Sequence, residues 1–196
     1  DVYIKGKIYN LNGTFIEYKV YVPNVNHRFG FGENTINMAN FYPVVAVIEN
    51  GEFVCDPYNY NGDPFYSDVA NYNVSLTVPN SYTVASTGEQ TKVTETDNTK
   101  TYSINAICVR DFAFVMSDKF QIATDSIDGV KVMYYYYNDA EFENNLKAGI
   151  DAVKTFNKLF GKYPYSTLSV VKANFVHGGM EYPNLVYISD EVEGAD

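Results

Sequence analysis

The feature that most limits how this chain can fold is a change in the spacing of its apolar residues near residue 138. Before that point, short segments alternate apolar and polar side chains and are separated by Asn, Asp, Gly and Pro, which is typical of β-strands. After it, apolar residues recur every three or four positions, as on one face of a helix. We therefore expect a mainly β protein with an α+β part at its C-terminal end.

The all-β part is expected to span residues 1–137. Its clearest strand runs from Tyr72 to Val78, where apolar residues occupy alternate positions, and it ends at Pro79. Further strands are expected over residues 2–9, 14–22, 82–86, 91–96, 99–107, 112–116 and 129–137. So many short strands indicate a β-sandwich or a domain of curved open sheets.

A helix is predicted over residues 139–160. Asn138 and Glu141 have the spacing of a capping box, and Gly161 marks the end of the helix. The apolar stripe that predicts the helix consists of Phe142, Leu146, Ile150, Val153, Phe156 and Phe160. Without a larger partner domain this stripe is covered by the β part, by another chain, or not at all, and dimerisation through it is a hypothesis.

Two further strands are expected after the helix, over residues 168–175 and 185–189. Because this helix-strand-strand pattern differs from the all-β pattern before it, we expect residues 138–196 to form part of a second domain.

Composition excludes several classes of function. Of the 196 residues, 46% are hydrophobic, which is ample for a folded core. The net charge of −10 argues against binding to nucleic acid or to anionic membranes, because both need a basic surface. It mildly favours cationic ligands such as peptide ammonium groups. No apolar run approaches the roughly 20 residues that span a bilayer, and the cellular compartment stays open between cytoplasmic and secreted or cell-associated.

Two cysteines, Cys55 and Cys108, are open to two interpretations. They can pair as a disulfide, or they can be two small buried hydrophobic residues.

The segment from His177 to Pro183 has the residue types of a binding site. Gly178 and Gly179 lack a Cβ atom, so another backbone can approach closely, and Glu181 offers a carboxylate beside them. Pro183 places the segment at a sheet edge or a strand end. Such an edge can bind a peptide by strand addition and its α-ammonium group by charge. The alternative is that Glu181 is an ordinary exposed glutamate on a strand.

This segment carries a resemblance to a known family. Residues 178–181, followed by 184–189, resemble the Gly-x-Met-Glu exopeptidase strand of the aminopeptidase N family of zinc metallopeptidases, the gluzincins. Most members have Asn after the glutamate, whereas Tyr182-Pro183 stands here, as in a bacterial branch of the family. Segments that resemble this branch occur in the same order upstream, at residues 40–46, 62–68 and 110–115.

The resemblance implies a fold and an activity. The family has an N-terminal β domain, of which the first strands would be absent here, followed by a thermolysin-like catalytic domain, of which residues 138–196 would be the first third or less. It implies a zinc-dependent aminopeptidase that removes N-terminal residues from peptides. Glu181 would hold the substrate α-ammonium group, and Gly178, Gly179 and Met180 would line the cleft. The preferred N-terminal residue stays open.

The same resemblance implies that zinc belongs to the complete enzyme and not to this chain alone. The family binds zinc through an H-E-x-x-H helix and a later glutamate, and by the family's order that helix would begin soon after Asp196. The histidines here, His27 and His177, are far apart and lack this pattern, so we expect both to be satisfied or solvated rather than metal ligands. We expect the chain alone to bind no zinc and to be inactive.

Two aromatic segments have alternative interpretations. The loop over residues 56–68 can be a calcium loop, a sugar-stacking platform or a packed surface loop, and its tyrosines do not fit the ligand spacing of an EF-hand. Tyr134 to Tyr137 predict a strand with alternate rings on opposite faces, and a carbohydrate platform is the alternative. For the whole chain, the rival to the aminopeptidase is a non-catalytic relative, a β-sandwich module that binds protein or peptide partners.

Overall fold

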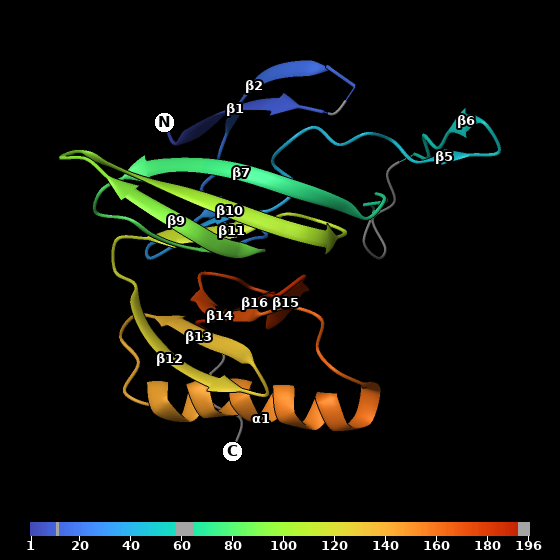
Figure 1. The fold of residues 1–196 in the computed structure, drawn as a ribbon. Coiled ribbons are helices and arrows are strands. Elements are labelled where there is room, and N and C mark those ends of the chain that lie inside the picture. Colours follow the sequence, from blue (N-terminus) through green and yellow to red (C-terminus); the bar gives the residue numbers. More distant parts are fainter. Residues whose placement is uncertain (11, 58–64, 192–196) are drawn as a thin grey trace.

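The computed structural model describes residues 1–10, 12–57 and 65–191. Within these ranges the protein is mainly β, with several sheets and the single helix α1 (Phe142–Phe160), which confirms the predicted fold class. Figure 1 shows the layers: an N-terminal hairpin, the sheets of the β part, a five-stranded sheet, and α1 at the opposite end of the molecule.

The β part contains eleven of the strands that the structure describes. Their bounds are β1 (Tyr3–Tyr9), β2 (Phe15–Tyr21), β3 (Phe29–Phe31), β4 (Ile36–Met38), β5 (Ile48–Glu49), β6 (Glu52–Phe53), β7 (Ala70–Pro79), β8 (Thr83–Ser86), β9 (Glu89–Glu95), β10 (Thr99–Val109) and β11 (Phe114–Ser117). Hairpin β1-β2 and ribbon β5-β6 are two-stranded, and the two larger sheets have the orders β7-β10-β9 and β3-β4-β11-β8.

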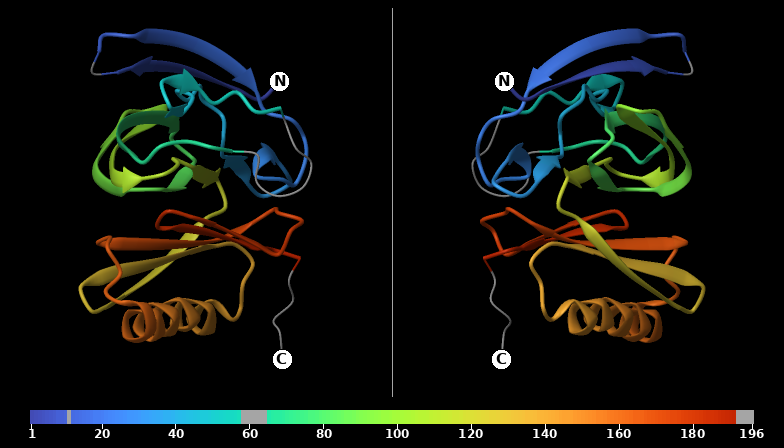
Figure 2. Two further views of the ribbon diagram at one scale, coloured as in Figure 1. Left: turned by 90° about the vertical axis from the view of Figure 1, so that its right-hand side faces the viewer. Right: turned by 90° about the vertical axis from the view of Figure 1, so that its left-hand side faces the viewer.

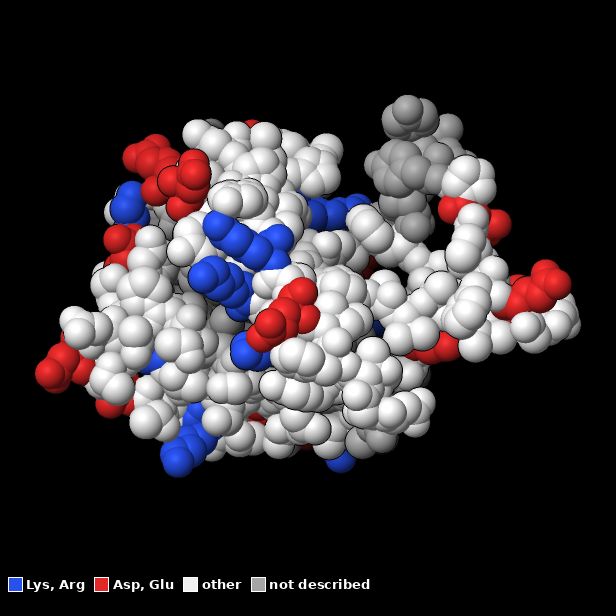
Figure 3. Space-filling view, turned by 90° about the horizontal axis from the view of Figure 1, so that it is seen from above, with Lys and Arg blue, Asp and Glu red and all other residues white. Residues whose placement is uncertain are grey.

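Hairpin β1-β2 carries side chains of both charges close together. Lys7 and Glu17 form an ion pair with Nζ and Oε1 2.6 Å apart. The Nζ atom of Lys19 lies over the rings of Tyr3 and Tyr21, 4.1 and 4.3 Å from their centroids. Figure 3 looks down on this side of the molecule and shows basic side chains gathered near the middle of the face with acidic ones beside them.

The five-stranded sheet joins segments from both sides of residue 138. Its order is β12 (Gln121–Ile127), β13 (Val130–Tyr136), β14 (Thr167–Ala173), β16 (Leu185–Ser189) and β15 (Gly179–Tyr182). Strands β13 and β14 are parallel and α1 connects them, as a parallel pair requires. Figure 2 shows α1 on the face of this sheet that points away from the β part. The change of periodicity thus falls inside one sheet, and the division into domains at residue 138 stays a prediction.

The surface where the β part meets the five-stranded sheet, called the seam below, is a buried apolar layer. Small residues on the side of the β part, Ala39, Ala85 and Ala113, are fully buried together with large residues of the sheet such as Tyr187. The Tyr187 hydroxyl donates to the Phe114 carbonyl oxygen at 3.3 Å. Alanine leaves room for an aromatic ring on the facing layer, so the two layers approach closely.

The predicted capping box at the start of α1 is wrong. Glu141 is the N-cap residue and makes no side-chain capping bond, while Asn138 adopts a positive φ of 46° in the turn before the helix. Asp139 instead forms the side-chain hydrogen bonds at the start of the helix. Its Oδ1 accepts the Glu141 backbone N–H at 2.9 Å, and its Oδ2 accepts the Asn145 side-chain N–H at 2.9 Å.

The apolar stripe of α1 is only partly covered by the sheet. Leu146, Ile150 and Val153 pack in a cluster with residues of β13 and β14. Phe156 and Phe160 are 56% and 81% exposed. The helix ends at Gly161 as predicted, and within the described ranges no helix is long and apolar enough to cross a membrane.

The four consecutive tyrosines are core residues. Tyr134 and Tyr136 stack with their ring centroids 5.4 Å apart on one face of the sheet, while Tyr135 and Tyr137 contact Phe120 on the other, which confirms the predicted alternation. All four are buried, so they do not form a carbohydrate platform.

The two cysteines fit neither interpretation offered by the sequence. Cys55 and Cys108 are both free and exposed, so they form neither a disulfide nor a buried hydrophobic pair. Cys108 lies in an irregularity of β10, where its φ is 54°.

Candidate functional site

The glycine-glutamate segment forms the terminal strand of the five-stranded sheet. Strand β15 pairs antiparallel with β16, and the two-residue turn Pro183-Asn184 connects them. Asn184 has a φ of 49°. A positive φ is typical of the third residue of a four-residue β-turn whose second residue is proline. The predicted placement of Pro183 at a strand end, on a sheet edge, is therefore confirmed.

This turn is fixed to the rest of the molecule through Asn184, which is only 5% exposed. Its side-chain oxygen accepts the Gly88 backbone N–H at 2.7 Å, and its side-chain nitrogen donates to Thr167 Oγ1 at 2.9 Å. The turn is therefore held both by the β part and by β14.

Side chains alternate across β15. Met180 and Tyr182 face the seam and pack there. Glu181 points to the other face of the sheet, where its register partner Val186 belongs to the cluster beneath α1. Because α1 contacts β12 and β13, at the far end of the sheet, it leaves Glu181 exposed.

The backbone of Glu181 points away from the sheet. A two-residue turn makes its flanking pair, Tyr182 and Leu185, a hydrogen-bonded pair, so the next such pair is Met180 with Tyr187. The N–H and C=O of the intervening Glu181 therefore face the outer edge. Among residues 1–10, 12–57 and 65–191, no further strand pairs with that edge.

The two glycines have different structural roles. Gly178 has a φ of 76°, and a Cβ placed there would meet no atom within 4 Å. At Gly179 a Cβ would lie 3.2 Å from the Tyr187 carbonyl oxygen, so the close backbone approach at this glycine comes from β16. The substrate-binding roles of Gly178, Gly179, Met180 and Glu181 stay predictions.

The structure also brings together the two histidines, which sequence reasoning had kept apart. The Nε2 atoms of His27 and His177 are 3.0 Å apart although the residues are separated by 150 positions. Both rings contact the fully buried Phe175 ring, with centroids 6.4 and 5.6 Å from it. No local sequence motif predicts this contact between the two histidines, because it depends on how two loops meet across the seam.

Burial lowers the pKa of the His27 imidazole, and the charges of His177 and Arg28 lower it further. This shift favours the neutral ring, which has a lone pair available for bonding.

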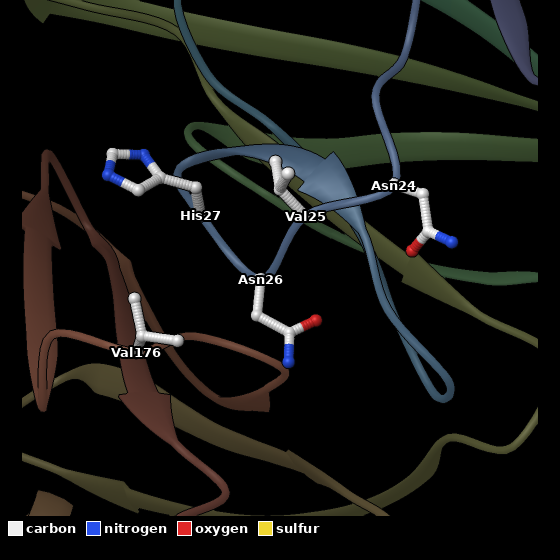
Figure 4. Close-up of a pocket in the computed structure, with 5 residues that line it drawn as sticks. All are labelled: Asn24, Val25, Asn26, His27 and Val176. Atoms are coloured by element: carbon white, nitrogen blue, oxygen red, sulfur yellow. The ribbon is translucent and has the colours of Figure 1, made fainter.

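A shallow hollow of about 570 Å³ lies beside this histidine pair. It is lined by Asn24, Val25, Asn26, His27 and Val176, from two loops on either side of the seam (Figure 4). Glu181 is not among the lining residues, so this hollow and the edge of β15 are two different features of the surface.

The ligands of a catalytic zinc are not assembled in the part of the chain that the structure describes. Within it, no three His, Cys, Asp or Glu side chains are grouped so as to hold a metal ion. A catalytic zinc needs about three protein ligands, so these residues do not fit it. Residues 58–64 of the proposed calcium or sugar loop lie outside the described residues.

Comparisons with known proteins give a likeness of fold. No family model matches the chain, and no curated protein matches it. Among solved structures, the chain is similar to a mutant of a two-domain M1 zinc metallopeptidase bound to L-arginine, with a TM-score of 0.51 and 19% sequence identity. The likeness covers 63% of this chain and 31% of the peptidase chain, so it spans less than a third of that protein. At the level of the fold, it supports the resemblance to the zinc metallopeptidase family that residues 178–181 indicate.

Proposed function

We propose that this chain supplies the N-terminal β part and the start of the catalytic domain of a zinc-dependent aminopeptidase, and that Glu181 recognises the α-ammonium group of its peptide substrate. The observation that carries this proposal is the position of Glu181: an exposed carboxylate on a terminal strand whose backbone faces the outer edge. The M1 likeness of the fold and the resemblance of residues 178–181 support it.

Recognition would use two kinds of contact. A peptide lying along β15 adds a strand through the outward N–H and C=O of Glu181, which gives affinity without regard to sequence. The Glu181 carboxylate then pairs with the peptide's first ammonium group, a charge-assisted contact of about 1.5–3 kcal/mol. Because the pairing requires a free amino terminus, it selects an exopeptidase substrate.

The chain's own part in the reaction is binding and orientation. The described residues do not assemble the three protein ligands of a catalytic zinc, so the role assigned to them is confined to binding the substrate. We expect the chain alone, supplied with zinc, to release no N-terminal amino acid from an alanine anilide. Zinc-dependent release above the level of an unrelated protein would contradict this expectation.

The binding proposal is tested with tetraalanine and its N-acetylated form, each titrated into the chain and followed by NMR. We expect the free peptide to perturb the amide signals of β15. The acetylated peptide should bind at least about tenfold more weakly. Glu181→Gln should remove this preference. Glu143→Gln, which removes the same charge from an exposed position on α1, is the matched control and should retain it.

The same titration distinguishes the rival function, a non-catalytic module that binds extended peptides. A module that uses only the backbone edge of β15 would bind both peptides equally, with or without the Glu181 carboxylate. Equal binding by wild type and Glu181→Gln would therefore favour the module over the aminopeptidase.

A further inference from the structure

We infer that His27 and His177 form a binding site for one divalent transition-metal ion of the late first row, such as Cu²⁺, Ni²⁺ or Zn²⁺. The two Nε2 atoms lie 3.0 Å apart, at a distance where one ring donates a hydrogen bond to the other, and both residues are exposed. Imidazole is a preferred ligand of these metals.

The separation of the two nitrogens matches what one ion requires. Nitrogen ligands about 2.0–2.1 Å from a metal lie roughly 2.9 Å apart in neighbouring square-planar positions and roughly 3.3 Å apart in tetrahedral ones. The observed 3.0 Å lies between these values. The ring that donates this hydrogen bond can carry its proton on Nδ1 instead, which leaves a lone pair on both Nε2 atoms. Exposed imidazoles can also rotate about their side-chain bonds, so both lone pairs can turn toward one ion without movement of the backbone.

The two loops that carry the histidines are already joined. The Val176 backbone N–H donates to the Asn26 carbonyl oxygen at 3.2 Å. The side-chain amide of the fully buried Asn37 donates to the carbonyl oxygens of His27 and Asn174, at 3.0 and 2.8 Å. The site is therefore largely preorganised, and the metal need not fix two mobile loops.

The surroundings leave room for the remaining ligands of the ion. The buried ring of Phe175 lies beneath both imidazoles, and the hollow lined by Asn24 and Val176 opens beside His27. Water can therefore occupy the other coordination positions. With two protein ligands and the Arg28 charge nearby, we expect micromolar rather than nanomolar affinity.

Bound metal would clamp the β part to the start of the edge strand. His27 belongs to the loop before β3, and His177 lies two residues before β15. The ion would therefore connect the two sides of the seam through two coordinate bonds, in addition to the apolar contacts of the core. This inference does not depend on peptide binding at Glu181.

The test is a calorimetric titration of Ni²⁺ into the full chain carrying Cys55→Ser and Cys108→Ser, because the exposed thiols would otherwise bind metal. We expect one ion per chain. Since two tethered imidazoles act together, His27→Ala or His177→Ala should each weaken binding by about 100-fold. Asn24→Ala, an exposed change in the same hollow, should leave the affinity within about twofold of the parent.

A second measurement keeps the result independent of folding effects. Ni²⁺ should raise the thermal midpoint of the parent and of Asn24→Ala, and should not raise that of either histidine variant, because only the first two bind in the native state. Urea unfolding without metal should give the same midpoint for all of them. Binding of Ni²⁺ that is unchanged when either histidine is replaced, or absent from the parent, would overturn the inference.

Discussion

Thr35 and Asn174 exchange two hydrogen bonds across 139 positions of the chain. The Thr35 backbone N–H donates to Asn174 Oδ1 at 3.0 Å, and the Asn174 backbone N–H donates to Thr35 Oγ1 at 3.0 Å. Asn174 Oδ1 also accepts the Asn34 backbone N–H at 2.6 Å. Because Thr35 and Asn174 are both buried, these bonds are shielded from water and hold the loop between β3 and β4 to the end of β14.

We expect Asn174→Ala to reduce the free energy of unfolding by about 2–4 kcal/mol, because two backbone N–H groups lose their acceptor. Urea unfolding followed by tyrosine fluorescence measures this loss. Asn24→Ala, which removes the same side chain from an exposed position, should cost less than about 0.5 kcal/mol. Similar midpoints for the two variants would show that the buried amide does not hold the seam.

Gly88 and Gly129 form a matched pair for a test of close packing. Both have positive φ, 86° and 83°. A Cβ at Gly88 would lie 2.6 Å from the Asn105 carbonyl oxygen, whereas one at Gly129 would meet nothing within 4 Å. Gly129→Ala should therefore cost about 1 kcal/mol from backbone strain. Gly88→Ala should cost about 2–4 kcal/mol, since strain and overlap combine.

Differential scanning calorimetry of the two glycine variants measures that difference. Equal melting temperatures would mean that β10 moves away from the added methyl group at no cost. Displacement of the backbone in Gly88→Ala should also loosen the turn at Asn184, because the Gly88 N–H donates to that side chain.

The Asp139 carboxyl predicts a dependence of stability on pH. Burial raises its pKa, but hydrogen bonds from Tyr134, Asn145 and the Glu141 backbone outweigh burial, and the net pKa is lowered. A lowered pKa in the folded state gives stability that is present above the unfolded value of about 3.9 and is lost as pH falls through the folded pKa.

Asp139→Asn should therefore be less stable than wild type at pH 7, by a few tenths to about 1 kcal/mol, because the site is largely solvent-screened. The gap should narrow as the pH is lowered below about 3.9 and through the folded pKa. Urea midpoints at pH 7 and at several acidic pH values measure it, with Asp118→Asn, at an exposed position, as the control. A gap that is constant across this range would show that Asp139 acts through shape and not through its charge.

Dimerisation through the exposed end of α1 stays a prediction. Phe156, Leu159 and Phe160 are 56%, 63% and 81% exposed on one turn of the helix. We expect light scattering to show a mass that rises toward the dimer with concentration. Phe156→Ser with Phe160→Ser should keep the chain monomeric and leave the fold intact, because neither ring is buried. A constant monomeric mass for the wild type would count against it.

Much of the fold follows from local patterns in the sequence. Alternation identifies strands such as β7 and β10, and the spacing of Leu146, Ile150 and Val153 identifies α1. Strands β3, β4, β5, β6 and β12 were not predicted. Asn50-Gly51 and Asp128-Gly129 do indicate the tight turns of hairpins β5-β6 and β12-β13, and all four residues have positive φ.

Other features could not be predicted, because they depend on long-range packing. The expected capping pair Asn138-Glu141 does not form, because the turn at Asn138 takes a positive φ, and Asp139 accepts the Glu141 N–H instead. The approach of His27 to His177 requires the loops on the two sides of the seam to meet. The edge position of Glu181, by contrast, could be predicted from Pro183, because proline lacks the N–H that a central strand needs for its hydrogen bonds.

The Thr35-Asn174 contact also constrains when the protein can finish folding during its synthesis. The loop that bears Thr35 is made before its hydrogen-bonding partner, which leaves the ribosome 139 residues later. At about 5–20 residues per second, that delay lasts roughly 7–28 s. From the synthesis of residue 113 until that of β16, the face of the β part that bears Ala39, Ala85 and Ala113 has no complete sheet against it. A chaperone that binds apolar surface on nascent chains would find this face open until Tyr187 emerges.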